Sequence, residues 1–252
     1  MNKLLSKIRT IFWVVTHMDI LFKHQYQMLV SYDKDGTNLI ADLCDKYGSD
    51  KGSLNSARRP YRWTAHTYAD FYNLLLFSRR ESVKKVFECG VGRATTFTAE
   101  DGSIIQGEPG ASLRMWRDYF PNARVIGADI NTEVLFEEDR IQTYVLDQTS
   151  STDIARFWSE ADMRDIDLIV DDGLHTYSAA VSLFENCIDH LADDGYYIIE
   201  DMHVHEIRKL QQYFADKDYS VNFVMLTRCD HRYGDNNLVV IRKREKKKAS
   251  DL

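Results

Sequence analysis

Two short apolar runs in the second half of the chain each end in acidic residues, and this pattern constrains the fold more than any other feature. The run IDLIV at 166–170 leads into the segment DDGLH at 171–175, and YYII at 196–199 leads into Glu200 and Asp201. Each run is typical of a short buried strand, and parallel strands bring their carboxyl ends to one edge of a sheet, where ligands bind. We therefore expect three acidic side chains and an imidazole to converge on one crevice.

Carboxylates that lie together repel one another unless a cation or a proton relieves them. The acidic strand ends therefore predict a divalent metal site with His175 beside it as a base. An alternative is that Asp172 or Asp201 only caps the helix that follows its strand. Because both strands end in acids and His175 follows Asp172 closely, we favour the metal site.

Beyond residue 83, short apolar runs alternate with helical patterns, which is typical of a doubly wound α/β sheet. The candidate strands are 85–88, 124–129, 141–146, 168–170, 196–199, 220–226 and 238–242, and the candidate helices are 112–119, 151–158, 176–191 and 205–214. The last two strands are joined by a polar loop too short for a crossover helix, so we expect an antiparallel hairpin. The predicted fold is a mostly parallel seven-stranded sheet with an antiparallel last strand.

The chain divides on this interpretation into three parts: an N-terminal helical segment at 1–82, the α/β domain at 83–243 and a basic tail at 244–252. The stretch 3–30 predicts an amphipathic helix that packs on the body or on a second subunit. Its apolar run at 11–15 is too short to cross a bilayer, so membrane contact would be at most peripheral. The polar segments 47–52 and 66–68 fit either a lid over the crevice or an ordinary loop.

Composition excludes some functions. A formal net charge of -7 argues against a general nucleic-acid binder. The four cysteines form no CxxC pair and follow no secretory signal, which predicts reduced core residues in a cytoplasmic protein. The apolar N-terminal stretch leads us to expect a homodimer.

The first strand runs into a glycine turn with an acid directly before it, Glu88-Cys89-Gly90-Val91-Gly92. Glycine lets the backbone approach a ligand closely. A dinucleotide fingerprint would need a third glycine at the position of Thr95. An acid ahead of the turn suits a cofactor that carries an ammonium group, as S-adenosylmethionine does.

The next two strands also end in polar groups. Asp129 is placed to accept both ribose hydroxyls of an adenosine, and Asp147 and Gln148 are placed to bond the adenine edge. We expect the residues at 95–111 to form a loop inserted beside the cofactor. The candidate cofactor-binding residues are Glu88, Gly90, Gly92, Ser112, Asp129, Asn131, Asp147, Gln148 and Asp171.

These motifs resemble a known family. The series YGSDKG, ECGVG, SLRMW, YFPNARVIGADI, DLIVDDGLH and YYIIEDMH, over roughly residues 43–205, is similar to the macrolide-sugar O-methyltransferases, which have relatives in surface-polysaccharide synthesis. The resemblance implies a class I methyltransferase fold, S-adenosylmethionine as cofactor and Mg²⁺ (or Mn²⁺) held by Asp172, Glu200 and Asp201. It also implies that His175 is the general base, with Asp172 beside it in catalysis, and that the acceptor is a sugar or nucleotide-linked sugar. The family has a large extra N-terminal region, and it commonly has Ser at the position of Leu174.

In the implied reaction, the metal ion lowers the pKa of a sugar hydroxyl, and a histidine, which titrates near neutral pH, takes its proton. Carboxylate ligands favour Mg²⁺ or Mn²⁺ over zinc. We also consider Tyr68, Arg93 and Arg232 as contacts for the acceptor. The remaining histidines near the predicted crevice are interpreted as surface or structural residues: His203, His205 and His231.

Three other functions stay open at this point. A methyltransferase of the catechol type also uses a metal ion and adjacent hydroxyls. A nicotinamide-dependent oxidoreductase shares the general sheet, although Glu88 and the missing third glycine argue against it. A non-catalytic binder of an adenosine cofactor is the third alternative, and the intact acidic residues argue against it.

Overall fold

A computed structural model describes residues 27–31, 38–52, 60–61, 63–98, 104–227 and 234–244. Most of the predicted N-terminal helix, nearly all of the basic tail, and Cys229, His231 and Arg232 lie outside the described residues. Cys44, Cys89 and Cys187 are buried free thiols, as expected. Within the described ranges, no helix is long and apolar enough to cross a membrane.

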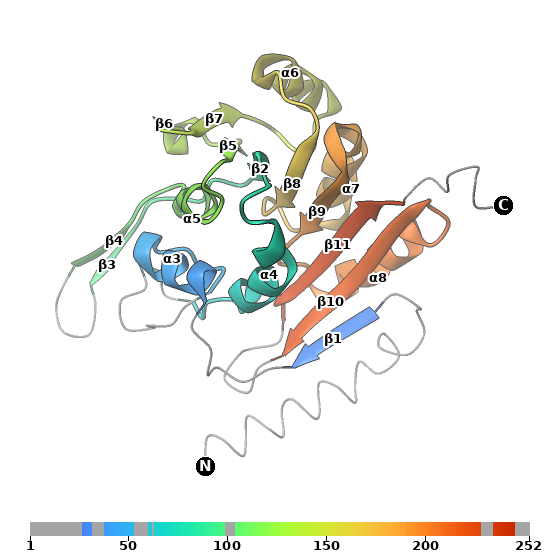
Figure 1. Ribbon diagram of the computed structural model, residues 1–252, viewed down its shortest axis with the longest axis horizontal. Coiled ribbons are helices and arrows are strands. Elements are labelled where there is room, and N and C mark those ends of the chain that lie inside the picture. The colour runs from blue at the N-terminus through green and yellow to red at the C-terminus, as the bar shows by residue number, and fades with distance from the viewer. Residues whose placement is uncertain are drawn as a thin grey trace, which may run out of the picture.

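The centre of the molecule is a nine-stranded sheet (Figure 1). Its strands are β1 (Gln27–Ser31), β2 (Lys85–Cys89), β5 (Arg124–Asp129), β6 (Glu137–Glu138), β7 (Ile141–Val145), β8 (Ile166–Asp171), β9 (Leu191–Ile199), β10 (Tyr219–Thr227) and β11 (Asn237–Lys243). The strand order is β1-β10-β11-β9-β8-β2-β5-β7-β6. Strand β11 runs antiparallel to both β10 and β9, whereas β2, β5, β7, β8 and β9 are parallel. The predicted seven strands and the antiparallel last strand are confirmed.

Two further strands widen the sheet beyond the prediction. Strand β1 lies parallel to β10 at one edge, and the short β6 lies antiparallel to β7 at the other. The helix predicted over 3–30 is therefore wrong at its end, because residues 27–31 gain backbone hydrogen bonds from β10 instead. A local pattern does not reveal a partner that lies nearly 200 residues further along the chain.

The insertion predicted as a loop is a β-hairpin. Strands β3 (Thr95–Thr98) and β4 (Ile104–Gly107) pair antiparallel and project from the body (Figure 1). Their threonine, isoleucine and phenylalanine content favours strands. The prediction of a loop was wrong because the glycine and proline residues around the hairpin are also typical of an irregular loop.

Helices cover both faces of the sheet (Figure 1). One layer contains α3 (Leu39–Tyr47), α4 (Tyr68–Leu76) and α5 (Ala111–Tyr119), and the other contains α6 (Ser151–Ala161), α7 (Tyr177–Cys187) and α8 (Val204–Phe214); short 3-10 turns lie at η1 (Phe77–Arg79), η2 (Thr132–Val134) and η3 (Ile188–His190). Neighbouring strand residues point to opposite faces. Val86 and Val125 therefore join the core under the first layer, while Phe87 and Ile126 join the core under the second.

The predicted helices of the α/β domain are present, with one boundary corrected. Ser150 and Thr176 cap α6 and α7 by accepting hydrogen bonds from backbone amides. The helix predicted over 176–191 ends at Cys187, and Leu191 begins β9. As a result of this topology, the carboxyl ends of β2, β5, β7, β8 and β9 lie along one edge of the sheet.

Candidate active site

A cavity of about 1120 Å³ opens at the carboxyl edge of the parallel strands. Its wall includes the glycine turn after β2, the residues that follow β5 and β7, and the acidic segments after β8 and β9. Residues from the segment between β1 and β2 also line the cavity: 48–50, 60–61, 63–64 and His66. The cavity therefore lies where ligands bind in open α/β sheets.

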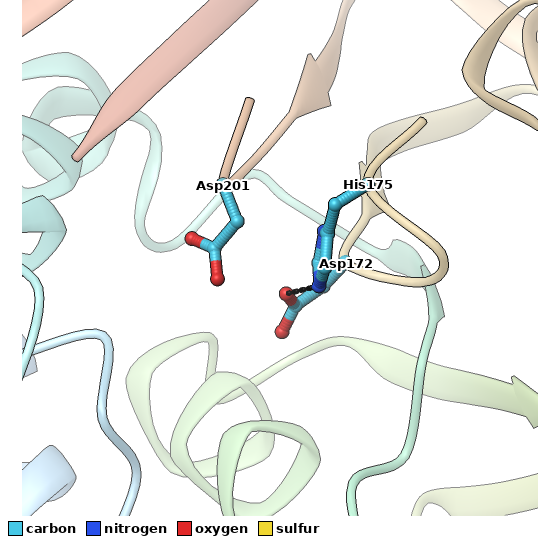
Figure 2. Close-up of side chains that lie close together, drawn as sticks. All are labelled: Asp172, His175 and Asp201. Carbon is cyan, nitrogen blue, oxygen red and sulfur yellow. Dashed lines mark ion pairs between the residues drawn. The ribbon is translucent and has the colours of Figure 1, made fainter. Parts of the chain in front are cut away.

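Asp172, His175 and Asp201 face one another in this cavity (Figure 2). One ligand atom from each lies within 4.8 Å of the others, and His175 Nε2 lies 4.0 Å from Asp172 Oδ1. His175 and Asp201 both have left-handed backbone conformations, with φ of 54° and 56°. Such conformations cost free energy for residues other than glycine and often occur at functional sites. We will call these three residues the acid–histidine cluster.

Neighbouring side chains fix both carboxylates of the cluster. Lys51 Nζ donates to Asp172 Oδ2 at 2.7 Å, and Tyr68 Oη donates to Asp201 Oδ1 at 2.6 Å. His66 Nε2 lies 3.4 Å from the same oxygen of Asp201. Tyr68, predicted to contact the acceptor, is fully buried and orients Asp201 instead.

Lys51 is the main electrostatic feature behind the cavity wall. The side chain is 1% exposed and pairs with Asp172, with Glu200 and, at 3.7 Å, with Glu88. Burial opposes its charged form, but the three carboxylates outweigh this effect and raise the Lys51 pKa well above its usual range. Lys51 therefore stays charged and offsets part of the acidic cluster.

Glu88 and Glu200 are both buried beneath the cavity and are not among the described residues that line it. Ser112 and Trp116 donate to the Glu88 carboxylate, and Lys51 and Tyr72 donate to that of Glu200. Burial raises the pKa of both carboxyls, against the opposing effect of Lys51. Both predicted roles, ammonium binding by Glu88 and metal binding by Glu200, stay predictions.

On the cofactor side, the structure brings most of the predicted residues to one wall. Gly90, Gly92, Ser112, Asp129, Asn131, Asp147 and Gln148 all line the cavity. Gly90 and Gly92 have positive φ values of 103° and 80°, which glycine adopts without strain. The Asp129 carboxylate accepts from the backbone amides of Val91 and Asn131, so it ties the glycine turn to the end of β5.

Hydrogen bonds of Gln148 to Asp171 and Leu174 hold the loop 171–174 in place. Gln148 Nε2 donates to Asp171 Oδ1 at 3.1 Å, and Gln148 Oε1 accepts from the Leu174 amide at 2.6 Å. Burial raises the Asp171 pKa to about 6, although the Gln148 hydrogen bond opposes the shift. Asp171, a predicted cofactor contact, is buried and is not among the described cavity residues.

Other predicted contacts fall in different places. Arg93 is exposed and lines the cavity. His203 and His205 stack on each other at the start of α8 and are not among the described cavity residues. His66 was noted in the sequence only as part of a lid or loop, yet it lines the cavity beside Asp201. Burial opposes its charge, but Asp201 and Asp235 outweigh burial and raise its pKa to about 9.

Sequence reasoning missed several residues of the site. Lys51, Tyr72 and Trp63 come from the segment between β1 and β2, where no strand end marks them as functional. The motif YGSDKG contains Lys51, but a lysine in a turn is usually solvated. Only the packing of this segment over the sheet brings Trp63 to the cavity and buries Lys51 and Tyr72 behind its wall.

Comparison with known proteins identifies relatives of one kind. The chain is 30% identical over 176 residues to 8-demethyl-8-alpha-L-rhamnosyl tetracenomycin-C 2'-O-methyltransferase from Streptomyces olivaceus, a match that covers 70% of the chain and 41% of the relative. It is 28% identical over 170 residues to mycinamicin VI 2''-O-methyltransferase from Micromonospora griseorubida, covering 67% of the chain and 40% of the relative. The chain thus spans about two fifths of the length of the curated relatives it matches. No protein-family model matches the chain.

Solved structures agree with this result. The MycE methyltransferase of mycinamycin biosynthesis, solved in complex with Mg, SAH and mycinamycin VI, has a TM-score of 0.59 to this chain at 22% identity. The match covers 82% of the chain and 54% of MycE. The likeness confirms the predicted class I methyltransferase fold. The curated homologues are sugar O-methyltransferases, which confirms the resemblance inferred from the motifs.

Proposed function

We propose that this protein transfers a methyl group from S-adenosylmethionine to a hydroxyl group of a sugar, with a divalent metal ion and His175 as general base. The observation that carries the proposal is the acid–histidine cluster, which shares one cavity with the glycine turn after β2. The relatives support the same reaction, because those named above are sugar O-methyltransferases.

The donor set fits a hard divalent cation. Asp172 and Asp201 offer carboxylate oxygens on opposite sides of one small space, and such oxygens suit Mg²⁺ or Mn²⁺. Glu200 is the third proposed ligand and would have to turn from Lys51 and Tyr72 to reach the ion. When bound, the ion would supply positive charge that stabilises the developing alkoxide of the acceptor.

The residues of the chain account for the remaining chemistry. His175 Nε2 faces Asp172 and would take the proton of the acceptor hydroxyl. S-adenosylmethionine, when bound, would supply the methyl group and would leave as the neutral thioether. Lys51 and Tyr68 hold the carboxylates of the cluster in place, so that little reorganisation is needed during the reaction.

The proposed cofactor site is the part of the cavity wall formed by the glycine turn after β2 and the residues that follow β5 and β7. Gly90 and Gly92 allow the methionine part to approach the backbone, and Asp129 would accept the ribose hydroxyls. Both Asp129 oxygens already accept backbone amides, but each carboxylate oxygen has a second lone pair. Asp147 and Gln148 are proposed beside the adenine edge, and Ser112 and Asn131 beside the same ligand.

A first experiment separates this function from the alternatives. Calorimetric titration should show binding of S-adenosylhomocysteine and no binding of NADH. Methyl transfer to methyl α-L-rhamnopyranoside or dTDP-L-rhamnose, lost with a chelator, would support the sugar acceptor. Transfer to catechol with neither sugar accepted would overturn the sugar assignment in favour of the catechol type.

Replacement of His175 tests the mechanism. We expect His175→Ala to lower kcat by about 10²–10⁴-fold, the usual contribution of a general base, while S-adenosylhomocysteine still binds. His205→Ala is a matched control, because His205 is an exposed histidine that is not among the described cavity residues. A His175→Ala variant with nearly full activity would exclude the proposed proton transfer.

Finer points are also proposals. We propose that the protein is cytoplasmic and forms a homodimer. We also propose that it acts in polysaccharide or natural-product biosynthesis, on a free, nucleotide-linked or polymer-bound sugar. Sedimentation analysis of the full chain would test the dimer. Comparison of the two rhamnose probes would test whether a nucleotide improves recognition.

A further inference from the structure

The packing of the core does not explain why the indole side chain of Trp63 is exposed in the cavity wall. Trp63 lines the cavity and is 43% exposed, whereas Trp116 and Trp158 are 0% and 7% exposed. Removing apolar surface from water is favourable, so an indole left open inside a concave site offers binding free energy to a ligand.

Two neighbours hold the Trp63 ring in one orientation. Its Nε1 donates to Asp50 Oδ2 at 2.5 Å, and its face stacks on Tyr61 with ring centroids 5.2 Å apart and planes inclined by 27°. Tyr61 is itself buried, and its hydroxyl donates to the Ser49 carbonyl at 3.4 Å. A ring fixed in this way loses little conformational entropy when a ligand binds.

Trp63 and its two neighbours lie on the acidic side of the cavity. The Asp50 carbonyl accepts from the His66 amide at 2.7 Å, and His66 Nε2 lies 3.4 Å from Asp201 Oδ1. Asp201 belongs to the acid–histidine cluster, so Trp63 is connected through Asp50 and His66 to the part of the cavity where the proposed reaction takes place.

We infer that Trp63, backed by Tyr61 and held by Asp50, is the stacking platform for the pyranose ring of the acceptor. This inference rests on the proposed function. A pyranose presents a face of C–H groups that packs on an aromatic ring and a rim of hydroxyls that needs hydrogen-bond acceptors. The indole would cover the C–H face, and the carboxylate of Asp50 would accept from a rim hydroxyl.

The test measures methyl transfer from S-adenosylmethionine to methyl α-L-rhamnopyranoside and dTDP-L-rhamnose in the presence of Mg²⁺. We expect Trp63→Ala to raise the acceptor KM by about 3- to 10-fold with little change in kcat, as loss of one aromatic contact predicts. Trp63→Phe should keep most of the affinity, because a smaller aromatic face remains. Phe77→Ala is the matched control, since Phe77 is an exposed aromatic that is not among the described cavity residues.

Binding measurements separate a subsite from a structural role. Affinities for S-adenosylhomocysteine and Mn²⁺ should be the same in Trp63→Ala, Trp63→Phe and the wild type. An unchanged acceptor KM in Trp63→Ala would overturn the platform and leave the proposed function standing. Equal losses of S-adenosylhomocysteine, Mn²⁺ and acceptor affinity in both Trp63 variants would overturn it in favour of a structural role. A wild type that methylates neither sugar would overturn the proposed function and this inference together.

Discussion

At the scale of single residues, the buried ammonium of Lys51 is the group on which the site depends most. It pairs with three carboxylates: Glu88 near the end of β2, Asp172 after β8 and Glu200 after β9. Replacing one partner of a buried ion pair leaves the others charged, buried and uncompensated, which costs more than the pair itself contributes.

Lys51→Met should therefore lower the free energy of unfolding by about 3–5 kcal/mol, measured by urea denaturation. Lys46→Met is the control, because Lys46 pairs with Asp118 on the surface, and we expect a far smaller effect there. The double variant Lys51→Met/Glu200→Gln should recover part of the loss, since it removes one of the uncompensated charges. Similar stabilities for Lys51→Met and Lys46→Met would contradict this account.

The same residues show what a sequence can and cannot predict about a site. Asp172, His175 and Asp201 directly follow buried strands, so the rule that strand ends share one edge was enough to bring them together. Lys51, Tyr68 and Trp63 lie between β1 and β2, and only tertiary packing brings Trp63 to the cavity and buries Lys51 and Tyr68 behind its wall. Glu88 and Glu200 were expected at the cavity because they lie at strand ends, but both are buried. Their positions in the chain do not reveal that Lys51 lies behind the cavity wall.

At the scale of elements, the end of β2 and the end of β8 pass each other with no room for a side chain between them. A Cβ atom on Gly90 would lie 2.1 Å from the Asp172 carbonyl oxygen, whereas a Cβ atom on Gly92 would meet nothing within 4 Å. Both glycines have positive φ, so the two positions share the backbone strain and differ in the overlap.

Gly92→Ala should cost about 1–2 kcal/mol, the strain of a left-handed alanine. Gly90→Ala should cost roughly 3 kcal/mol or more, because steric overlap adds to the strain and displaces Asp172. Chemical denaturation measures both values, and Mn²⁺ titration should show weaker binding only in Gly90→Ala. Equal costs at the two positions would argue against the close approach.

A surface cluster joins α3 to α5 and gives a prediction for the dependence on pH. Asp118 accepts from Lys46 at 2.9 Å, from Arg117 at 2.9 Å and from Tyr47. Burial would raise the pKa of this carboxyl, but the hydrogen bonds from Tyr47, Lys46 and Arg117 outweigh it and hold the pKa well below its ordinary 3.8. A carboxyl whose pKa falls on folding stabilises the protein above its unfolded pKa and loses that effect as pH falls through the folded value.

Asp118→Asn should therefore be less stable than the wild type by about 1 kcal/mol at neutral pH, a value reduced for partial exposure. The difference should shrink as the pH drops below about 4, where the carboxyl of the unfolded chain takes up its proton. Thermal unfolding of both proteins across this range measures the effect. A constant difference at all pH values would assign it to packing instead of charge.

At the scale of the whole molecule, the pattern of buried runs predicted where the seven main strands lie in the chain, because hydrophobic periodicity is a local property. The short loop before the last strand predicted its antiparallel direction. The outer additions, β1 and the β3–β4 hairpin, were not predicted. Strand β1 depends on pairing with β10, and the hairpin leaves the body at a point where the sequence also fits a loop. The division of the chain at residue 82 stays a prediction, although β1 joins the sheet and α3 and α4 pack on one of its faces.

Because the proposed cofactor and metal sites share one cavity at the carboxyl edge of the sheet, their ligands should stabilise the entire fold. S-adenosylhomocysteine at 100 times its Kd should add about 2.7 kcal/mol, a rise in Tm of roughly 5–10 °C for a chain of this size. Mn²⁺ should raise Tm further, and a chelator should remove only that second part. Asp172→Asn should lose the Mn²⁺ increment and keep the one from S-adenosylhomocysteine, because Asp172 belongs to the acid–histidine cluster and not to the proposed cofactor wall. If S-adenosylhomocysteine does not change the Tm of the folded protein, the cofactor site is ruled out. If Mn²⁺ raises the Tm of Asp172→Asn as much as that of the wild type, the metal binds elsewhere.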